Sequence, residues 1–288
     1  MQDLSVQDVR DTNQNSQTRI DSIGLAFIYV LLFVAMQVVA TVVVLVAFVV
    51  SALSSGLNLA DPEILTQMTE SVIGLLPWIL LAANLLTILV GWGITRGRGY
   101  TLKEAAALRP LSWLLVVPTL LMGAGFSLGL NSLLALPLFS FASDSASTQA
   151  QSWLFGSLAM AIVASTITPI AEEIVFRGFI LTELRRKLTP AAAILLQAIA
   201  FGIMHGISAW GVSAIMMGVL FAWVALRTRS VYASMLTHIG LNAASFIYVA
   251  LMPDEPSIML LIILAGAGLL VFVLCVGASM RLTSRGES

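Results

Sequence analysis

Residues 23–53 read IGLAFIYVLLFVAMQVVATVVVLVAFVVSAL, a run that contains no Asp, Glu, Lys, Arg or His. About 20 apolar residues are enough for a helix to cross the hydrocarbon core of a bilayer, and this run is longer than that. In lipid, a backbone segment must satisfy its own hydrogen bonds, which a helix does. The run therefore predicts a membrane-spanning helix.

Seven further apolar segments follow, each bounded by charged or turn residues. With the first they give eight candidate spans, at 23–53, 71–94, 113–136, 153–181, 191–206, 210–226, 231–251 and 258–280. Hydrophobic residues make up 59% of the 288 positions and charged residues only 10%, a balance that indicates a membrane protein. We expect an all-α, polytopic transmembrane bundle of about eight spans, an integral multi-pass protein of the inner or plasma membrane if the source is bacterial.

No linker is long enough to divide the apolar segments between two folded domains. The sequence therefore predicts a single membrane domain over 23–280, with its catalytic core at about 153–248. A polar N-terminal tail at 1–22 is expected to be disordered, and a short polar tail follows at 281–288.

The positions of the basic residues predict the orientation of the spans. Lys and Arg occur before the first span and after the second, fourth, sixth and eighth, and Arg177 is the one basic residue inside a span. The loops at the opposite ends contain acids and no Lys or Arg. Because cytoplasmic loops attract Lys and Arg, both termini are predicted to be cytoplasmic.

Charge and cysteine content exclude two classes of protein. The formal net charge of −1 provides no basic surface of the kind that binds nucleic acid. Cys275 is the single cysteine, so no intrachain disulfide can form. The glycine-rich stretches at 122–126 and 265–268 predict close helix packing and carry no chemistry.

Five charged or imidazole side chains fall within the predicted spans: Glu172, Glu173, Arg177, His205 and His238. Such groups at bilayer depth cost about 3 kcal/mol each on insertion scales, so their presence indicates function. The simpler interpretation of each histidine alone is a polar side chain that forms a hydrogen bond with a neighbouring helix. However, both histidines of the protein occur together with a pair of acids, and this combination favours a functional site.

Helix geometry separates the two glutamates. Glu173 and Arg177 are four residues apart with the acid first, the favourable order for an ion pair, which we interpret as structural. Glu172 points about 100° away around the helix. It is our candidate general base, a carboxylate that takes a proton from water and returns it to a leaving amine. The alternative is that both acids neutralise Arg177, although one would suffice.

His238 and Asn242 are also four residues apart, so both side chains leave the same helix face. Together they can stabilise the negative oxygen of a tetrahedral intermediate, and His205 can orient the water that Glu172 activates. The alternative for Asn242 is a helix-to-helix hydrogen bond of about 1 kcal/mol.

Counting residues from the predicted cytoplasmic helix ends gives the depth of each group. At about 1.5 Å of rise per residue, Glu172 and His238 lie roughly 12 to 14 Å deep, and His205 roughly 22 Å deep. The fifth span must therefore tilt, start late or stop inside the bundle. Its apolar run of about 16 residues is indeed short for a full crossing.

Three motifs on successive spans, Glu172-Glu-x-x-x-Arg177, Phe201-x-x-x-His205 and His238-x-x-x-Asn242, resemble those of the CAAX-processing and bacteriocin-processing (CPBP, abortive-infection-like) intramembrane endopeptidases. The resemblance covers about residues 153–248. It implies that Glu172 and His205 activate a water, while His238 and Asn242 support the oxyanion.

The resemblance leaves the metal dependence open, because the family has been described both as metalloproteases and as metal-independent glutamate-type enzymes. Glu172, His205 and His238 are candidate zinc ligands. The sequence contains no His-Glu-x-x-His, and an Asn in the fourth position suits a hydrogen-bond donor better than a zinc ligand. Metal-free catalysis is therefore favoured, with zinc as the alternative cofactor.

Two other functions are kept as alternatives: a non-catalytic membrane binding or immunity protein of the same fold, and a proton-coupled transporter. The convergence of a spare acid with two histidines argues against the first, and the absence of paired, interrupted spans in matching halves argues against the second. The expected partners are membrane lipid and a peptide or protein substrate: a prenylated tail, a leader peptide or a membrane-protein segment.

Overall fold

The computed structural model describes residues 4–142, 158–253 and 255–285, and for residues 4–21 it describes the backbone alone. All elements of these described residues are helical, which confirms the predicted all-α class. The longer helices are α1 (Leu4–Ser54), α2 (Pro62–Gly97), α4 (Trp113–Leu134), α9 (Pro190–Met204), α10 (Ala209–Thr228), α11 (Val231–Leu251) and α12 (Ile258–Arg285). The short ones are α3 (Leu102–Ala105) and η1 (Pro137–Ala142).

One helical stretch is built from five consecutive pieces: α6 (Leu158–Ile162), η2 (Val163–Ile167), α7 (Thr168–Glu173), η3 (Ile174–Ile180) and α8 (Leu181–Arg185). We call this stretch, residues 158–185, the motif helix. It begins inside the fourth predicted span, whose first residues, 153–157, lie outside the described residues.

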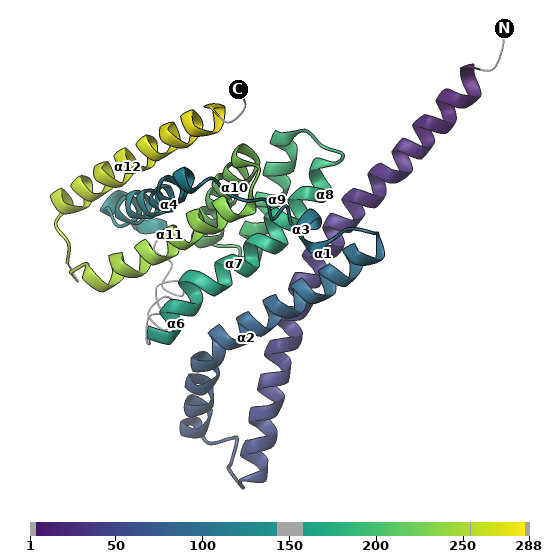
Figure 1. Cartoon of the computed structure of the whole chain (residues 1–288). Helices are drawn as coiled ribbons and strands as arrows, with labels where there is room; N and C mark the ends of the chain where they lie inside the picture. The colour runs from purple at the N-terminus through teal and green to yellow at the C-terminus, as the bar shows by residue number, and fades with distance from the viewer. Residues whose placement is uncertain (1–3, 143–157, 254, 286–288) are drawn as a thin grey trace.

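The helices occupy the eight predicted positions. Six of them, α1, α2, α4, α10, α11 and α12, are long and apolar enough to cross a membrane, and α9 is a shorter apolar helix. The motif helix supplies the remaining position. The chain is therefore an integral, multi-pass membrane protein with a polytopic helical bundle (Figure 1).

In the N-terminal tail, α1 already begins at Leu4, and it runs without interruption to Ser54. Residues 4–22 contain neither Pro nor Gly, so no residue there interrupts a helix that the apolar span has already nucleated. This part of α1 projects away from the other helices (Figure 1). Similarly, α12 extends to Arg285, so residues 281–285 of the predicted C-terminal tail are helical.

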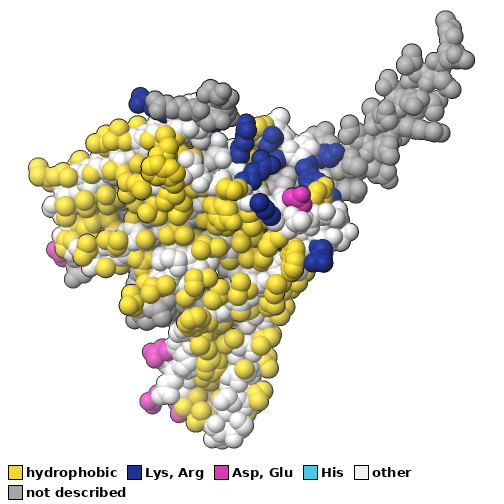
Figure 2. All heavy atoms as spheres, viewed as in Figure 1, with side chains coloured by type: hydrophobic (Ala, Val, Ile, Leu, Met, Phe, Trp, Pro, Cys, Tyr) yellow, Lys and Arg dark blue, Asp and Glu magenta, His cyan; other side chains and the backbone are white. Residues whose placement is uncertain are grey.

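The surface of the bundle separates apolar from charged side chains. Large apolar residues are exposed along the outer helices, for example Val43 and Leu53 on α1 and Leu274 on α12, each at about 60%. Figure 2 shows most Lys and Arg side chains gathered at the end where α3 and the C terminus lie. Most acidic side chains lie at the opposite end, near the α1–α2 connection. This separation agrees with the orientation predicted from the loops.

Glycines allow α4, α11 and α12 to pack closely, as the glycine-rich stretches predicted. A Cβ added to Gly123 would lie 1.8 Å from the carbonyl oxygen of Thr237 on α11. A Cβ added to Gly268 on α12 would lie 2.4 Å from the backbone nitrogen of Gly129 on α4. Backbones at these distances leave no room for a larger side chain, so the three helices form one tightly packed layer.

The motif helix lies at the centre of the molecule. From Val175 to Ile180 every side chain of η3 is buried. Phe179 stacks on Tyr29 of α1 at a centroid distance of 5.1 Å, and Phe176 contacts Phe201 of α9 edge-on at 5.0 Å. Aromatic contacts from two neighbouring helices therefore fix the rotation of the motif helix about its axis.

Candidate active site

The motif glutamates lie on α7, a short α-helical piece between two π-helical segments, η2 and η3. A π-helical turn holds one residue more than an α-helical turn, and such turns are frequent at functional sites. They rotate the side chains that follow them relative to a regular helix. The direction of each motif side chain therefore has to be taken from the structure.

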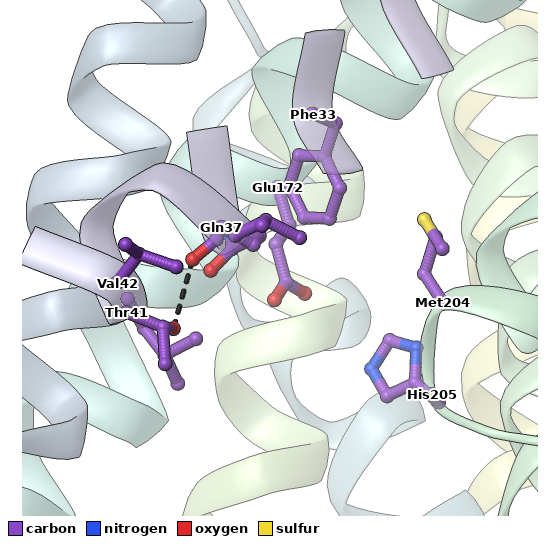
Figure 3. Close-up of a pocket in the computed structure, with 9 residues that line it drawn as sticks. Phe33, Gln37, Thr41, Val42, Glu172, Met204 and His205 are labelled. Atoms are coloured by element: carbon purple, nitrogen blue, oxygen red, sulfur yellow. Dashed lines mark hydrogen bonds between the residues drawn. The ribbon is translucent and has the colours of Figure 1, made fainter. Parts of the chain in front are cut away.

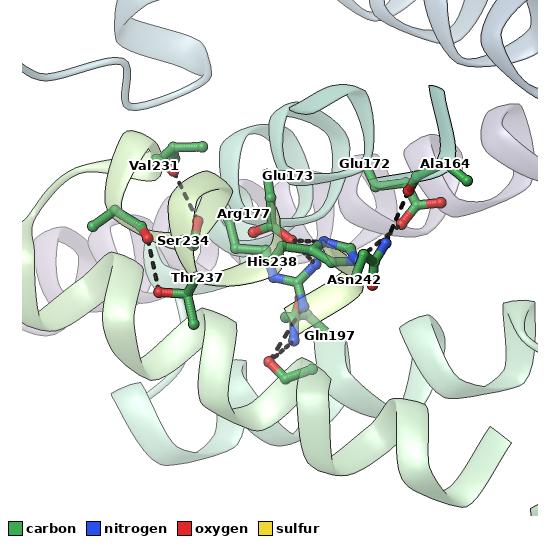
Figure 4. A network of polar contacts seen from close by, with 12 residues as sticks. Ala164, Glu172, Glu173, Arg177, Gln197, Val231, Ser234, Thr237, His238 and Asn242 are labelled. Carbon is green, nitrogen blue, oxygen red and sulfur yellow. Dashed lines mark hydrogen bonds and ion pairs between the residues drawn. The ribbon is translucent and has the colours of Figure 1, made fainter. Parts of the chain in front are cut away.

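Glu173 is fully buried and its Oε1 accepts two hydrogen bonds. One comes from Nη1 of Arg177 at 2.9 Å, in the ion pair that the four-residue spacing suggested. The other comes from Nδ1 of His238 on α11, also at 2.9 Å (Figure 4). Glu173 is therefore more than the partner of Arg177, because it also fixes the position of a motif histidine. The sequence reasoning missed this second contact.

Arg177 lies between aromatic rings and has little access to solvent. Its guanidinium carbon is 4.4 Å from the ring centroid of Phe201 and 5.0 Å from that of Phe221. Nη2 also donates to the carbonyl oxygen of Gly218 on α10, at 3.4 Å. A buried cation needs such compensation, which ion pairing and ring faces supply together. Arg177 thereby ties α9 and α10 to the motif helix.

His238 presents its second nitrogen to the other motif acid. Its ring stacks on Phe221 at 4.4 Å, and its Nε2 lies 3.9 Å from Oε2 of Glu172. Because Nδ1 lies against the carboxylate of Glu173, it carries a proton. Nε2 is then the atom of His238 that faces Glu172, too far for a direct hydrogen bond but close enough to share a small bound group.

His205 caps the C-terminal end of α9, which stops at Met204. Gly206 follows with φ of +101°, a backbone conformation that glycine adopts readily. Nδ1 of His205 lies 2.8 Å from the carbonyl oxygen of Phe201, which can only accept, so Nδ1 is the protonated nitrogen. The helix of the fifth span thus ends just before His205, and the next two residues, Gly206 and Ile207, are exposed.

Glu172 and His205 line the same cavity, which has a volume of about 480 Å³. Figure 3 shows one ring nitrogen of His205 facing the side on which the carboxylate of Glu172 lies. The rest of the lining comes from α1, from Leu80 of α2 and from Met204 of α9, and it is chiefly apolar apart from Gln37 and Thr41 of α1. We call this cavity the glutamate pocket. It combines one acid and one imidazole with apolar walls, as ligand sites commonly do.

The contribution of α1 and α2 to the glutamate pocket was not foreseen from the sequence. Gln37 on α1 donates from Nε2 to Oδ1 of Asn84 on α2, at 3.2 Å. The Oε1 atom of Gln37 is buried and has no hydrogen-bond partner among the described residues. An amide in an otherwise apolar span is a signal that could have indicated these positions.

Asn242 lies on the same face of α11 as His238, as its spacing required, but part of its hydrogen-bonding capacity is used. Nδ2 donates to the carbonyl oxygen of Ala164, in the π-helical segment η2, at 3.0 Å. This contact is the helix-to-helix hydrogen bond that was the alternative interpretation. One N–H of the amide remains for a second acceptor.

The sequence suggested Glu172, His205 and His238 as candidate zinc ligands. The described part of the chain holds no group of three His, Cys, Asp or Glu side chains spaced to bind a metal ion. Zinc ligands lie about 2 Å from the ion and must therefore converge closely. Glu172, His205 and His238 do not meet this requirement as the structure places them.

Comparison with known proteins gives two findings. A family profile described as "Type II CAAX prenyl endopeptidase Rce1-like" matches residues 153–244. The chain is also 30% identical over 132 residues to the "Putative membrane peptidase YdiL" of Bacillus subtilis (strain 168). That alignment covers 46% of this chain and 52% of the relative, so the chain matches about half of the relative's length. No solved structure matches.

Both findings agree with the resemblance of the three motifs. The profile match contains Glu172, Glu173, Arg177, His205, His238 and Asn242. The motif helix, α9, α10 and most of α11 lie within it, while α1 and α2, which complete the glutamate pocket, lie outside. Over residues 153–244, this chain is therefore similar to the Rce1-like CAAX prenyl endopeptidases, in agreement with the motif resemblance.

Proposed function

We propose that this protein is an intramembrane endopeptidase in which Glu172 activates the water that hydrolyses a peptide bond. The observation that carries the proposal is the different use of the two neighbouring acids. Glu173 is buried between Arg177 and His238, whereas the side chain of Glu172 is 14% exposed and lines the glutamate pocket with His205. One acid is engaged in structure and the other is available to a water and a substrate.

The water would lie between the carboxylate of Glu172 and Nε2 of His205, which accepts one of its hydrogens. Glu172 removes the other hydrogen as a proton while the water oxygen attacks the carbonyl carbon of the peptide. The new C–O bond turns the carbonyl oxygen into an oxyanion. Glu172 then gives its proton to the amide nitrogen, the C–N bond breaks, and a carboxylic acid and an amine leave.

The oxyanion would be stabilised by His238 and by the remaining N–H of Asn242. Because Nδ1 of His238 already bonds to Glu173, a bond from Nε2 to the oxyanion requires the imidazolium form. Both motif acids lie against this ring, Glu173 at Nδ1 and Glu172 at Nε2.

The substrate would be a peptide or protein segment that reaches the glutamate pocket within the membrane, with access from the cytoplasmic side as part of the proposal. The apolar walls from α1 and α2 suit a hydrophobic segment or a lipidated tail. Catalysis is proposed to be metal-independent, with zinc as the alternative. The chemistry assigned here uses only the carboxylate, imidazole and amide groups of the chain.

The test compares newly formed peptide termini in membranes of cells that produce the wild-type protein or one of two variants. Glu172→Gln removes the proposed base with nearly the same shape, and Glu70→Gln removes an exposed acid of α2 as the matched control. We expect termini that appear with wild-type protein and Glu70→Gln and are absent with Glu172→Gln. Identical termini with wild-type protein and Glu172→Gln would remove Glu172 as the base.

A further inference from the structure

A second cavity, of about 230 Å³, lies against the C-terminal end of the motif helix. It is bordered by the α3–α4 connection, α8 and the turn between α10 and α11. Four arginines line it, Arg109, Arg177, Arg185 and Arg229, and a single acid, Glu104, faces them. We call it the arginine cavity.

The arginine cavity carries a net positive charge. Arg177 is paired with Glu173, and the other charged side chains of the lining are Arg109, Arg185, Arg229 and Glu104. Glu104 is in turn engaged in the N-terminal cap of α3, where its Oε2 accepts from the backbone N–H and the hydroxyl of Thr101 at 2.9 and 2.8 Å. These bonds lower the pKa of the Glu104 carboxyl below its ordinary value. Arginines therefore outnumber acids in the lining of the cavity.

The walls of the arginine cavity are fixed by contacts between distant parts of the chain. The hydroxyl of Ser230 donates to the carbonyl oxygen of Arg109 at 2.6 Å, and the N–H of Val231 donates to the carbonyl oxygen of Ala107 at 3.4 Å. Ala107 and Arg229 have φ angles of +48° and +56°, and no other described non-glycine residue has a positive φ. Strained backbone of this kind persists where the surroundings hold it, often at ligand sites.

One buried donor in this wall has no partner. Arg177 is 1% exposed, and its Nε has no acceptor among the residues that the structure describes. An unsatisfied buried N–H is unfavourable unless a ligand or water accepts from it. The arginine cavity thus combines several arginines with fixed walls, which together suit an oxyanion.

The position of the arginine cavity indicates the membrane interface. Trp113, which starts α4 four residues after Arg109, is 79% exposed, and tryptophan is enriched where lipid headgroups meet the hydrocarbon. The lining also contains Leu181 and Leu226, so apolar surface adjoins the arginines. Basic pockets between helices on the cytoplasmic side are suited to anionic headgroups.

We propose that the arginine cavity binds the phosphate group of an anionic phospholipid. Arg109, Arg185 and Arg229 would contact the phosphate oxygens, as guanidinium groups do in paired hydrogen bonds. The glycerol and acyl chains would leave along Leu181 and Leu226 towards the lipid. Binding of this kind needs no peptidase activity, so its test is independent of the function proposed for Glu172.

The experiment uses the full-length protein, delipidated in a non-ionic detergent, with dioleoyl phosphatidylglycerol and dioleoyl phosphatidylcholine as probes. Native mass spectrometry measures how much of each lipid the protein retains. In the double variant Arg109→Gln/Arg229→Gln, we expect phosphatidylglycerol binding to weaken about 10- to 30-fold, on the basis of two lost arginine contacts at an anionic surface. The double variant Arg96→Gln/Arg98→Gln removes the same charge from an exposed segment outside the cavity. Its binding should change by no more than about twofold.

Equal weakening in both double variants would show that the protein attracts anionic lipid by general surface charge, and would overturn the proposal. Thermal unfolding of the wild-type protein gives a measurement that does not depend on any variant folding. A higher midpoint with phosphatidylglycerol than with phosphatidylcholine or inorganic phosphate supports a lipid headgroup. An equal rise with inorganic phosphate assigns the same site to free phosphate. No rise with either anion would refute phosphate binding.

Discussion

The neighbouring acids Glu172 and Glu173 should respond in opposite ways to the same chemical change. Replacing either by Gln keeps the shape of the side chain and removes its charge. Glu173→Gln leaves Arg177 buried without its counterion, since both side chains are 0% exposed. Breaking a buried ion pair from one side destabilises a protein by about 3–5 kcal/mol. We therefore expect Glu173→Gln to unfold far more easily than the wild-type protein.

Glu172→Gln should leave stability nearly unchanged. Nε2 of His238 lies 3.9 Å from the Glu172 carboxylate, beyond hydrogen-bonding distance, and the Glu172 side chain lines the glutamate pocket. We expect a change of less than about 1 kcal/mol in the free energy of unfolding. Cleavage, by contrast, should fall by a factor of about 10² or more, because the proton acceptor for the water is lost.

The assay is reversible unfolding in mixed micelles, with cleavage measured on the same preparations. The magnitude distinguishes an ion pair from an ordinary polar contact, because hydrogen bonds between membrane helices contribute on average about 0.6 kcal/mol and at most about 1.7. A loss of stability in that lower range for Glu173→Gln would refute the ion-pair argument. Equal destabilisation by both variants would refute the division of roles between Glu172 and Glu173.

Four further predictions follow from the site and the packing. His205→Gln should lower kcat about 10²- to 10⁴-fold with unchanged unfolding, and a normal rate would exclude His205 from positioning the water. Gln37→Leu should raise KM up to about tenfold for a peptide that spans an identified cleavage site, because Gln37 lines the glutamate pocket and its side-chain oxygen has no partner among the described residues. A change confined to kcat would contradict this role. Gly123→Ala should destabilise the protein by at least about 1–3 kcal/mol, since the new methyl group would lie 1.8 Å from a backbone oxygen. Gly266→Ala should be nearly neutral, because a Cβ added there meets nothing within 4 Å. Equal effects of the two variants in unfolding measurements would refute the close packing. Treatment with a zinc chelator should leave cleavage unchanged, and a loss that zinc restores would establish the metal-dependent alternative.

The depth of the site shows where counting along the sequence was insufficient. The fourth span was predicted to end at residue 181, but the motif helix continues to Arg185, thirteen residues beyond Glu172. At about 1.5 Å per residue this places Glu172 roughly 20 Å from its helix end, close to the roughly 22 Å counted for His205. The apparent mismatch between the two groups came from the boundary of one helix.

His238 reaches Glu172 for a different reason. It lies only seven residues after the start of α11 at Val231, roughly 10 Å along the helix. The start of α11 is held by the carbonyl oxygens of Ala107 and Arg109, in the connection between α3 and α4. Residue counting assumes that all helices start at one level, and tertiary contacts remove that assumption.

The sequence by itself determined the membrane class, the approximate spans and the residues from which a site can be built. Apolar length and the spacing of charges are local properties, and bilayer thickness turns them directly into helices. Only the tertiary structure decided that Glu173 holds both Arg177 and His238, and that α1 and α2 complete the glutamate pocket with Gln37. These contacts join residues far apart in the chain, and they depend on helix rotation, stagger and π-helical turns, which hydrophobic periodicity does not encode.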